Sequence, residues 1–195
     1  MTTTRRNVVI ALLVTVGLVG LHYALRAPYP SDRTPEGAYG RVTIAVNLGR
    51  PRDFFAYIET PAQHACFTIR DYRKKARDLV LASYPEPERT RLAAEYAPEA
   101  ETADGADLFV FYALHRGFMA HLRRDMSGVA AVEIHGERAT VVTARGTRYP
   151  FRRRPENGIW GLTLFTARLV ADAEKAARDL AIVEAAAADY QRAAH

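Results

Sequence analysis

The hydrophobic period of the chain changes once, near Gly128, and this change limits the fold more than any other feature. Before Gly128, apolar residues recur at intervals of three and four, which is typical of amphipathic helices. After it, apolar and polar residues alternate as far as Leu164, which is typical of strands with one buried face. Because helices and strands are segregated along the chain, the sequence predicts the α+β fold class.

Proline follows threonine at Thr34-Pro35 and again at Thr60-Pro61, and both pairs indicate helix starts. The threonine hydroxyl caps the first turn, and proline fits there because it has no N–H to leave unpaired. Gly49 predicts the end of the first helix. Helices are expected at residues 35–48, 52–58, 61–83, 88–96, 106–124 and 166–193.

Three turns divide the alternating region into four strands. They are Gly136-Glu137, Arg145-Gly146 and Asn157-Gly158, and Asn-Gly is the strongest of these hairpin signals. The sequence therefore predicts a curled four-stranded antiparallel meander. One face of this sheet is apolar, and we expect the helices to cover it.

The N-terminus predicts a membrane anchor. Val8–Leu25 is an apolar run of about 18 residues, the low end of what a bilayer core requires. Arg5 and Arg6 precede it, and the positive-inside rule then keeps the N-terminus in the cytoplasm. We expect residues 1–26 to form a single-pass signal-anchor in the inner membrane, with the lipid bilayer as partner and the domain outside the cytoplasm. A cleaved signal peptide and a buried core helix are the alternatives.

The remaining chain divides into a proline-rich linker at 27–34, an α+β domain at 35–165 and the C-terminal helix at 166–195. The last helix carries a heptad seam of apolar and small residues. Its interaction residues are Leu169, Leu180, Val183 and Tyr190. Two covers for this seam stay open: the helix folds back on its own domain, or it pairs with another copy or an envelope-complex partner.

Composition excludes some classes of function. The formal net charge of +5 includes Arg5, Arg6 and Arg26, and the rest of the chain has 24 basic against 22 acidic residues. This balance does not favour a nucleic-acid partner. A single cysteine, Cys66, permits no internal disulfide. No phosphate-binding loop, paired-cysteine metal pattern or nucleophile elbow is present, so no cofactor and no metal are expected.

Three segments resemble the nuclear-transport-factor-2-like (SnoaL-like) superfamily. Thr34–Ala38 is similar to the opening of that family's first helix, Asn47–Ile58 to its short second helix, and Val132–Leu164 to its sheet. The resemblance covers residues 34–165 and implies a cone-shaped fold with a pocket. It implies no particular reaction, because this superfamily includes enzymes, binding modules and assembly subunits.

Tyr112 and His115 are the candidate catalytic residues. They share a helical face with Phe111 and Phe118, so we expect both to face inward beneath the sheet. An imidazole near a phenol there could serve as a general base or bind a ligand. The alternative is a core histidine with a backbone partner. Cys66 and Trp160 are expected to fill the core.

Arg148, Arg152 and Arg154 alternate along one predicted strand and should share one of its faces. Such a row could contact anionic lipid headgroups or an acidic partner. The alternative is the solvated outer face of the sheet. The sequence as a whole favours a membrane-tethered, non-enzymatic ligand-binding or protein-interaction module of the bacterial cell envelope. The alternative is a small-molecule enzyme with isomerase-like or hydrolase-like acid–base chemistry in the cone.

Overall fold

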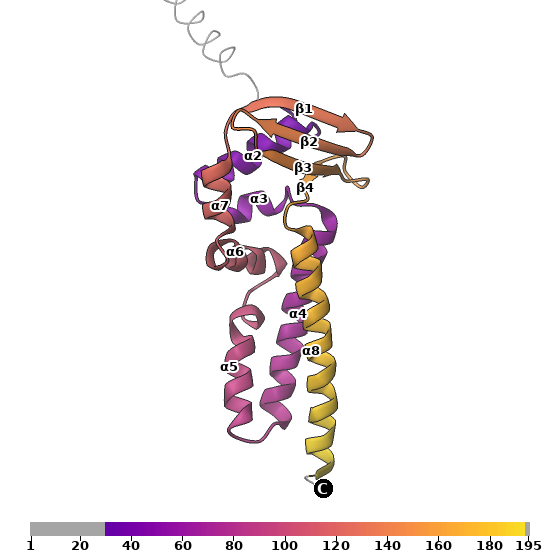
Figure 1. The fold of residues 1–195 in the computed structure, drawn as a ribbon. Coiled ribbons are helices and arrows are strands. Elements are labelled where there is room, and N and C mark those ends of the chain that lie inside the picture. Colours follow the sequence, from indigo (N-terminus) through magenta and orange to yellow (C-terminus); the bar gives the residue numbers. More distant parts are fainter. Residues whose placement is uncertain (1–29, 194–195) are drawn as a thin grey trace, which may run out of the picture. The chain divides into compact units, whose positions relative to one another are not determined.

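The computed structural model describes residues 30–193, and the chain from Ser31 onward forms one compact unit (Figure 1). The helices are α2 (Pro35–Asn47), α3 (Pro51–Phe55), α4 (Thr60–Ser83), α5 (Glu88–Ala100), α6 (Gly105–His115), α7 (Phe118–Asp125) and α8 (Thr166–Ala193). The strands are β1 (Val129–His135), β2 (Arg138–Thr143), β3 (Arg148–Arg153) and β4 (Trp160–Leu162). The predicted α+β segregation, with strands after helices and one long final helix, is confirmed.

The predicted fold class requires one correction, in its membrane-spanning helix. Within residues 30–193, every helix is too short or too polar to traverse a lipid bilayer. The two longest, α4 and α8, carry charged residues such as Arg73 and Asp179 along their length. The predicted span at Val8–Leu25 lies outside the described residues. The structure therefore supports the α+β domain, without a membrane-spanning helix in residues 30–193.

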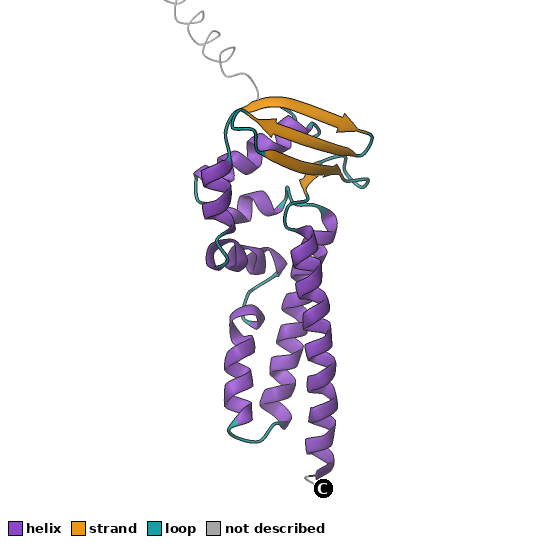
Figure 2. Ribbon diagram, viewed as in Figure 1, coloured by secondary structure: helices purple, strands orange, loops and turns teal. Residues whose placement is uncertain are grey.

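The sheet is the predicted antiparallel meander, with strand order β1-β2-β3-β4. Each of its three turns contains a glycine with positive φ: Gly136 at 61°, Gly146 at 79° and Gly158 at 73°. Turns with positive φ favour glycine, because the Cβ of any other residue crowds the backbone in that conformation. Val141, Phe151 and Leu162 occupy the buried face, which α2 covers (Figure 2).

The helix expected at 106–124 is two helices. Gly117 has φ +74°, which ends the α-helical path, and α6 stops just before it while α7 begins just after. The break rotates the second half of the segment relative to the first. A second difference concerns α5, which continues through Pro98 to Ala100 because Tyr96 and Ala100 are buried against neighbouring helices. This extra turn fixes the position of Glu99.

The interior consists of two hydrophobic clusters. The larger lies between the sheet and the helices beneath it, and its biggest buried side chains include Phe54, Phe109, Tyr112 and Phe151. The smaller lies between α4, α5 and α8 and contains Val80, Tyr84, Tyr96, Leu180 and Val183. Cys66 and Trp160 belong to the larger cluster, as expected, and burial raises the pKa of the Cys66 thiol to about 12.

The seam of α8 packs inside the chain. Leu169, Leu180 and Val183 are buried, and Tyr190 is partly buried with its hydroxyl donating to Glu88 at 2.9 Å. Helices α4 and α8 run side by side over most of their length (Figure 1). Of the two covers left open by the sequence, the structure has the helix folded back on its own domain.

Candidate functional site

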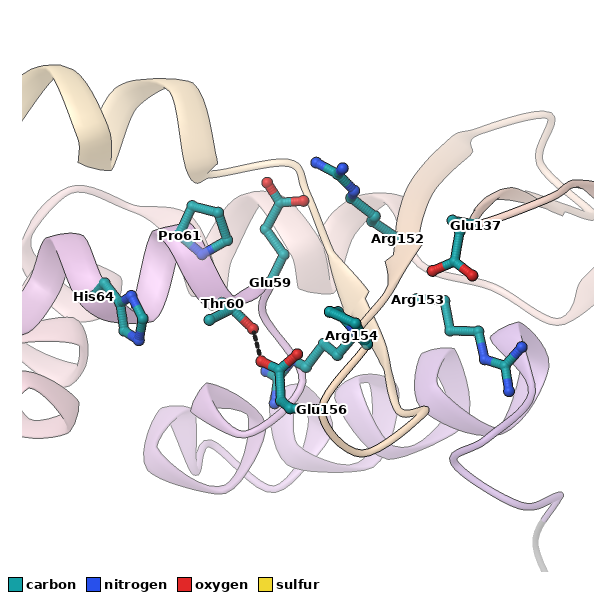
Figure 3. A pocket seen from close by; sticks show the side chains of 10 residues that line it. Glu59, Thr60, Pro61, His64, Glu137, Arg152, Arg153, Arg154 and Glu156 are labelled. Atoms are coloured by element: carbon teal, nitrogen blue, oxygen red, sulfur yellow. Dashed lines mark hydrogen bonds between the residues drawn. The ribbon is translucent and has the colours of Figure 1, made fainter.

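A pocket of about 340 Å³ lies where the start of α4, the β1–β2 turn and the β3–β4 loop meet (Figure 3). We call it the α4–β3 pocket. Its lining includes Glu59, Thr60, His64, Glu137, Glu156 and the consecutive arginines 152–154. A second hollow of about 540 Å³ shares Glu137 and residues 153–156 and continues to Arg33 and Gly158. The two form one trough along the end of β3.

Six charged side chains line the α4–β3 pocket without forming ion pairs. They are Arg152, Arg153, Arg154, Glu59, Glu137 and Glu156. Among the described residues, none of the six has a nitrogen–oxygen contact with an opposite charge within 4.0 Å. Arginine and glutamate side chains that lie close together ordinarily form ion pairs when they are long enough to contact one another. Here they come from three separate segments of the chain: the residue before α4, the β1–β2 turn and residues 152–156.

Arg154 is the most buried of these charges, with 7% of its surface exposed. Its Nη2 donates hydrogen bonds to the carbonyls of Ala56, at 2.7 Å, and Ile58. Its Nε is buried and has no hydrogen-bond partner among residues 30–193. Loss of hydration lowers the pKa of Arg154, and the nearby Glu156 charge only partly opposes this. Arg154 therefore joins the α3–α4 loop to the β3–β4 loop while its positive charge lacks a paired carboxylate.

Glu59 and Glu156 supply negative charge on the α4 side. Glu59 is the residue before α4, is 8% exposed, and donates its backbone N–H to the Leu162 carbonyl at 3.2 Å. A Cβ on Gly161 would lie 2.7 Å from Glu59 Cα, so glycine is required for this approach. Glu156 accepts a hydrogen bond from the Thr60 hydroxyl at 2.5 Å, which lowers the pKa of Glu156 (Figure 3).

The two candidate catalytic residues do not form a pair. Tyr112 is buried, and its hydroxyl donates to a Glu99 carboxylate oxygen. His115 is exposed, with Nδ1 2.8 Å from the Phe111 carbonyl oxygen. The expectation that both face inward is therefore wrong for His115, because it is the last residue of α6 and lies beyond the buried positions Leu108, Phe109, Tyr112 and Ala113. Burial and the Glu99 hydrogen bond raise the pKa of Tyr112, which makes it a poor acid–base group near neutrality.

The predicted arginine row also separates. Arg148 is exposed on the outer face of the sheet and pairs with Glu133. Arg152 is exposed and reaches the rim of the α4–β3 pocket. Arg154 is buried, so its expected place on the outer face is wrong. Strand β3 ends at Arg153, and the alternation of faces no longer applies beyond it.

Sequence reasoning did not single out Glu59, Glu137, Arg153 or Glu156. Each lies at a helix start, at a strand end or in a turn, where the hydrophobic period carries no information about direction. The one available signal was the run of three arginines at 152–154. Successive side chains of a strand point to opposite faces, so three adjacent arginines cannot all lie on the outer face. Among residues 30–193, no group of three or more histidine, cysteine or acidic side chains is placed to hold a metal ion.

No protein-family model, curated protein or solved structure matches this chain. The resemblance to the nuclear-transport-factor-2-like superfamily is therefore not tested by any relative and stays a prediction. The α4–β3 pocket is therefore the feature on which the proposed function rests.

Proposed function

We propose that the domain is a non-enzymatic binding module, and that the α4–β3 pocket takes a small ligand carrying both a carboxylate and an amine. The observation that supports this is the set of three arginines and three glutamates that line the pocket without pairing to one another. A zwitterionic ligand satisfies both signs at once, its carboxylate on the arginine side and its amine on the glutamate side.

The strength of binding follows from the exposure of these groups. Arg152, Glu137 and Glu156 are exposed, so their contacts are partly screened by water. Arg154 and Glu59 are buried and screened less. Hydrogen bonds to charged groups contribute about 1.5–3 kcal/mol each, so two of them give a dissociation constant on the order of 1 mM.

The pocket offers recognition rather than an activated nucleophile. The Thr60 hydroxyl is committed to Glu156, and no hydrogen bond among the described residues joins Thr60 to His64. The enzyme alternative rested on Tyr112 and His115 facing inward together, whereas Tyr112 is buried and His115 is exposed. Location outside the cytoplasm depends on residues 1–26 and stays a prediction.

Thermal unfolding with matched small molecules tests the proposal. Glycylglycine carries both charges, whereas succinate and 1,4-diaminobutane carry one sign each. At about 100 times its dissociation constant a ligand adds about 2.7 kcal/mol to folding, which raises Tm by roughly 5–10 °C in a domain of this size. We expect glycylglycine to raise Tm and the single-sign compounds to have little effect.

Substitutions then locate the effect. Arg152→Gln and Glu137→Gln are both on exposed side chains and should remove the glycylglycine shift while leaving the ligand-free Tm unchanged. Arg148→Gln is the control, because Arg148 is exposed on the same strand but outside the pocket. A shift that survives both pocket substitutions, or no shift with glycylglycine at any concentration, contradicts the proposal.

A further inference from the structure

The outer edge of β1 is open. In the sheet order β1-β2-β3-β4, β1 pairs with β2 on one side, and no strand among residues 30–193 pairs with its other side. The backbone N–H and C=O groups that alternate along this edge have no sheet partner within the described chain. The edge also lies clear of the helices in Figure 1.

The opposite edge of the same sheet is closed. Leu162 in β4 donates its N–H to the Tyr57 carbonyl at 2.7 Å and accepts from the Glu59 N–H at 3.2 Å. Ile58 forms a parallel bridge with Leu162 there. The loop before α4 thus covers β4. The β4 edge of the sheet is therefore covered by the loop before α4, whereas the β1 edge is not covered by residues 30–193.

Strand β1 has few of the features that keep edge strands from pairing. It is the longest strand of the sheet, and its sequence VAAVEIH contains no lysine, arginine or proline. Charge and proline are the usual protections of an exposed edge. One β-bulge, between Val129 and Ala131, disturbs only its first end. Six of the seven residues are exposed, with Ile134 at 54% and Val129 at 42%.

We propose that β1 pairs antiparallel with β1 of a second copy of this chain, about a two-fold axis at Val132, so that two sheets join into one. This register overlaps the whole strand. Glu133 then lies opposite Ala131 of the partner subunit, and Ile134 opposite Ala130 of the partner subunit. No like charges face each other, and apolar side chains meet across the axis.

Charge favours this register and a second copy as the occupant. Moving the axis by one residue, from Val132 to Glu133, would place Glu133 opposite its own copy, and like charges directly opposite are destabilising in a sheet. Self-association through α8 is closed, because Leu180 and Val183 are buried within their own chain. Among residues 30–193, the β1 edge is the sheet edge that no other segment covers. It uses no residue of the α4–β3 pocket.

Charge substitutions at Ala131 test the register. Ala131 is exposed, so both variants should fold normally. Ala131→Glu sets a second acid opposite Glu133 of the partner subunit, and the two-fold axis repeats the repulsion. Sedimentation of the full-length chain should then show a dimer dissociation constant raised about tenfold or more. Ala131→Lys should leave the dimer as tight or tighter. A monomeric wild-type chain at 100 μM overturns the proposal, as do equal effects of the two variants.

Cross-linking gives a second, independent readout. In the proposed register, Val132→Cys brings two thiols face to face on the axis, within the Cα separation of about 4.4–6.8 Å that a disulfide needs. Ile134→Cys is the control. This side chain is more exposed than Val132, but in the proposed register the two introduced cysteines are offset by four residues along the strands. Oxidation should link the Val132→Cys chains and not the Ile134→Cys chains. The reverse result, or equal linking of both, overturns the proposal.

Discussion

Arg73 of α4 donates a hydrogen bond from Nη1 to Asp179 Oδ2 of α8 at 2.7 Å, across the gap between the two hydrophobic clusters. Its Nε donates to Glu99 Oε2 of α5 at 2.8 Å. Glu99 in turn accepts from Tyr112, and Arg116 pairs with Asp172 nearby. A polar layer therefore separates the core under the sheet from the core of the three-helix end, and the longest helices pass through both.

Replacing Arg73 should destabilise the whole domain. The side chains of Arg73 and Glu99 are 11% and 19% exposed, so Arg73→Met removes a poorly hydrated cation from two carboxylates and leaves Glu99 with Arg116, at 3.6 Å, as its cation. We expect a loss of about 2–4 kcal/mol, near the range for breaking a buried ion pair. Lys74→Met is the control, because the Lys74–Asp78 pair is about half exposed and should contribute under about 0.5 kcal/mol. Urea unfolding measures both, and equal losses would contradict the polar layer.

Two buried tyrosines should respond oppositely to loss of the hydroxyl. Tyr112 donates to Glu99, so Tyr112→Phe removes a hydrogen bond to a charged group and should cost about 1.5–3 kcal/mol. The Tyr149 hydroxyl is buried without a partner among the described residues, so Tyr149→Phe should leave stability unchanged or raise it by up to about 1 kcal/mol. Urea midpoints decide this, and a large loss in Tyr149→Phe would reveal a hydroxyl partner.

The same hydroxyl predicts a loss of stability in alkali. Burial raises the pKa of Tyr149 from 10.0 to about 12, with smaller contributions from Tyr39 and Asp125. The folded state therefore holds this proton more tightly than the unfolded state. That contribution is complete below pH 10 and is lost as pH rises toward 12. Tyr149→Phe should flatten the fall in unfolding free energy between pH 10 and 12, and an unchanged slope would place the ionisation elsewhere.

Local signals in the sequence predicted much of the fold. The turns at Gly136, Gly146 and Gly158 depend on a few adjacent residues, and the final helix runs from Thr166 to Ala193 as its spacing indicates. The break at Gly117 was missed, because one glycine inside an apolar helical pattern does not reveal whether its φ is positive.

The direction of side chains was predicted less well. Periodicity tells which residues share a face, but tertiary packing decides where that face points. Tyr112 and His115 were assigned to one face, whereas packing buries the first and exposes the second. Arg154 was counted as part of a strand that ends one residue earlier. The α4–β3 pocket joins residues about 100 positions apart, such as Thr60 and Glu156, and no local pattern contains that contact.

The seam of α8 gives a sharp test of how this helix is used. Leu180 is 6% exposed and packs with Val80 and Tyr84, whereas Ile182, two residues along the same helix, is 67% exposed. Leu180→Asp buries a carboxylate with no partner, so we expect a loss of at least 3 kcal/mol, roughly the cost of a large core defect. Ile182→Asp should stay within about 0.5 kcal/mol of wild type.

Mass and stability must be measured together. If α8 serves its own domain, Leu180→Asp lowers Tm on a chain beginning at Ser31 and leaves the oligomeric state of the folded protein unchanged. If α8 instead pairs copies, the same substitution converts a dimer into a monomer while the sheet stays folded. The contacts of Leu180 with α4 favour the first outcome, since the side chain is already covered within one chain. Equal behaviour of Leu180→Asp and Ile182→Asp would show that the buried seam is wrongly assigned.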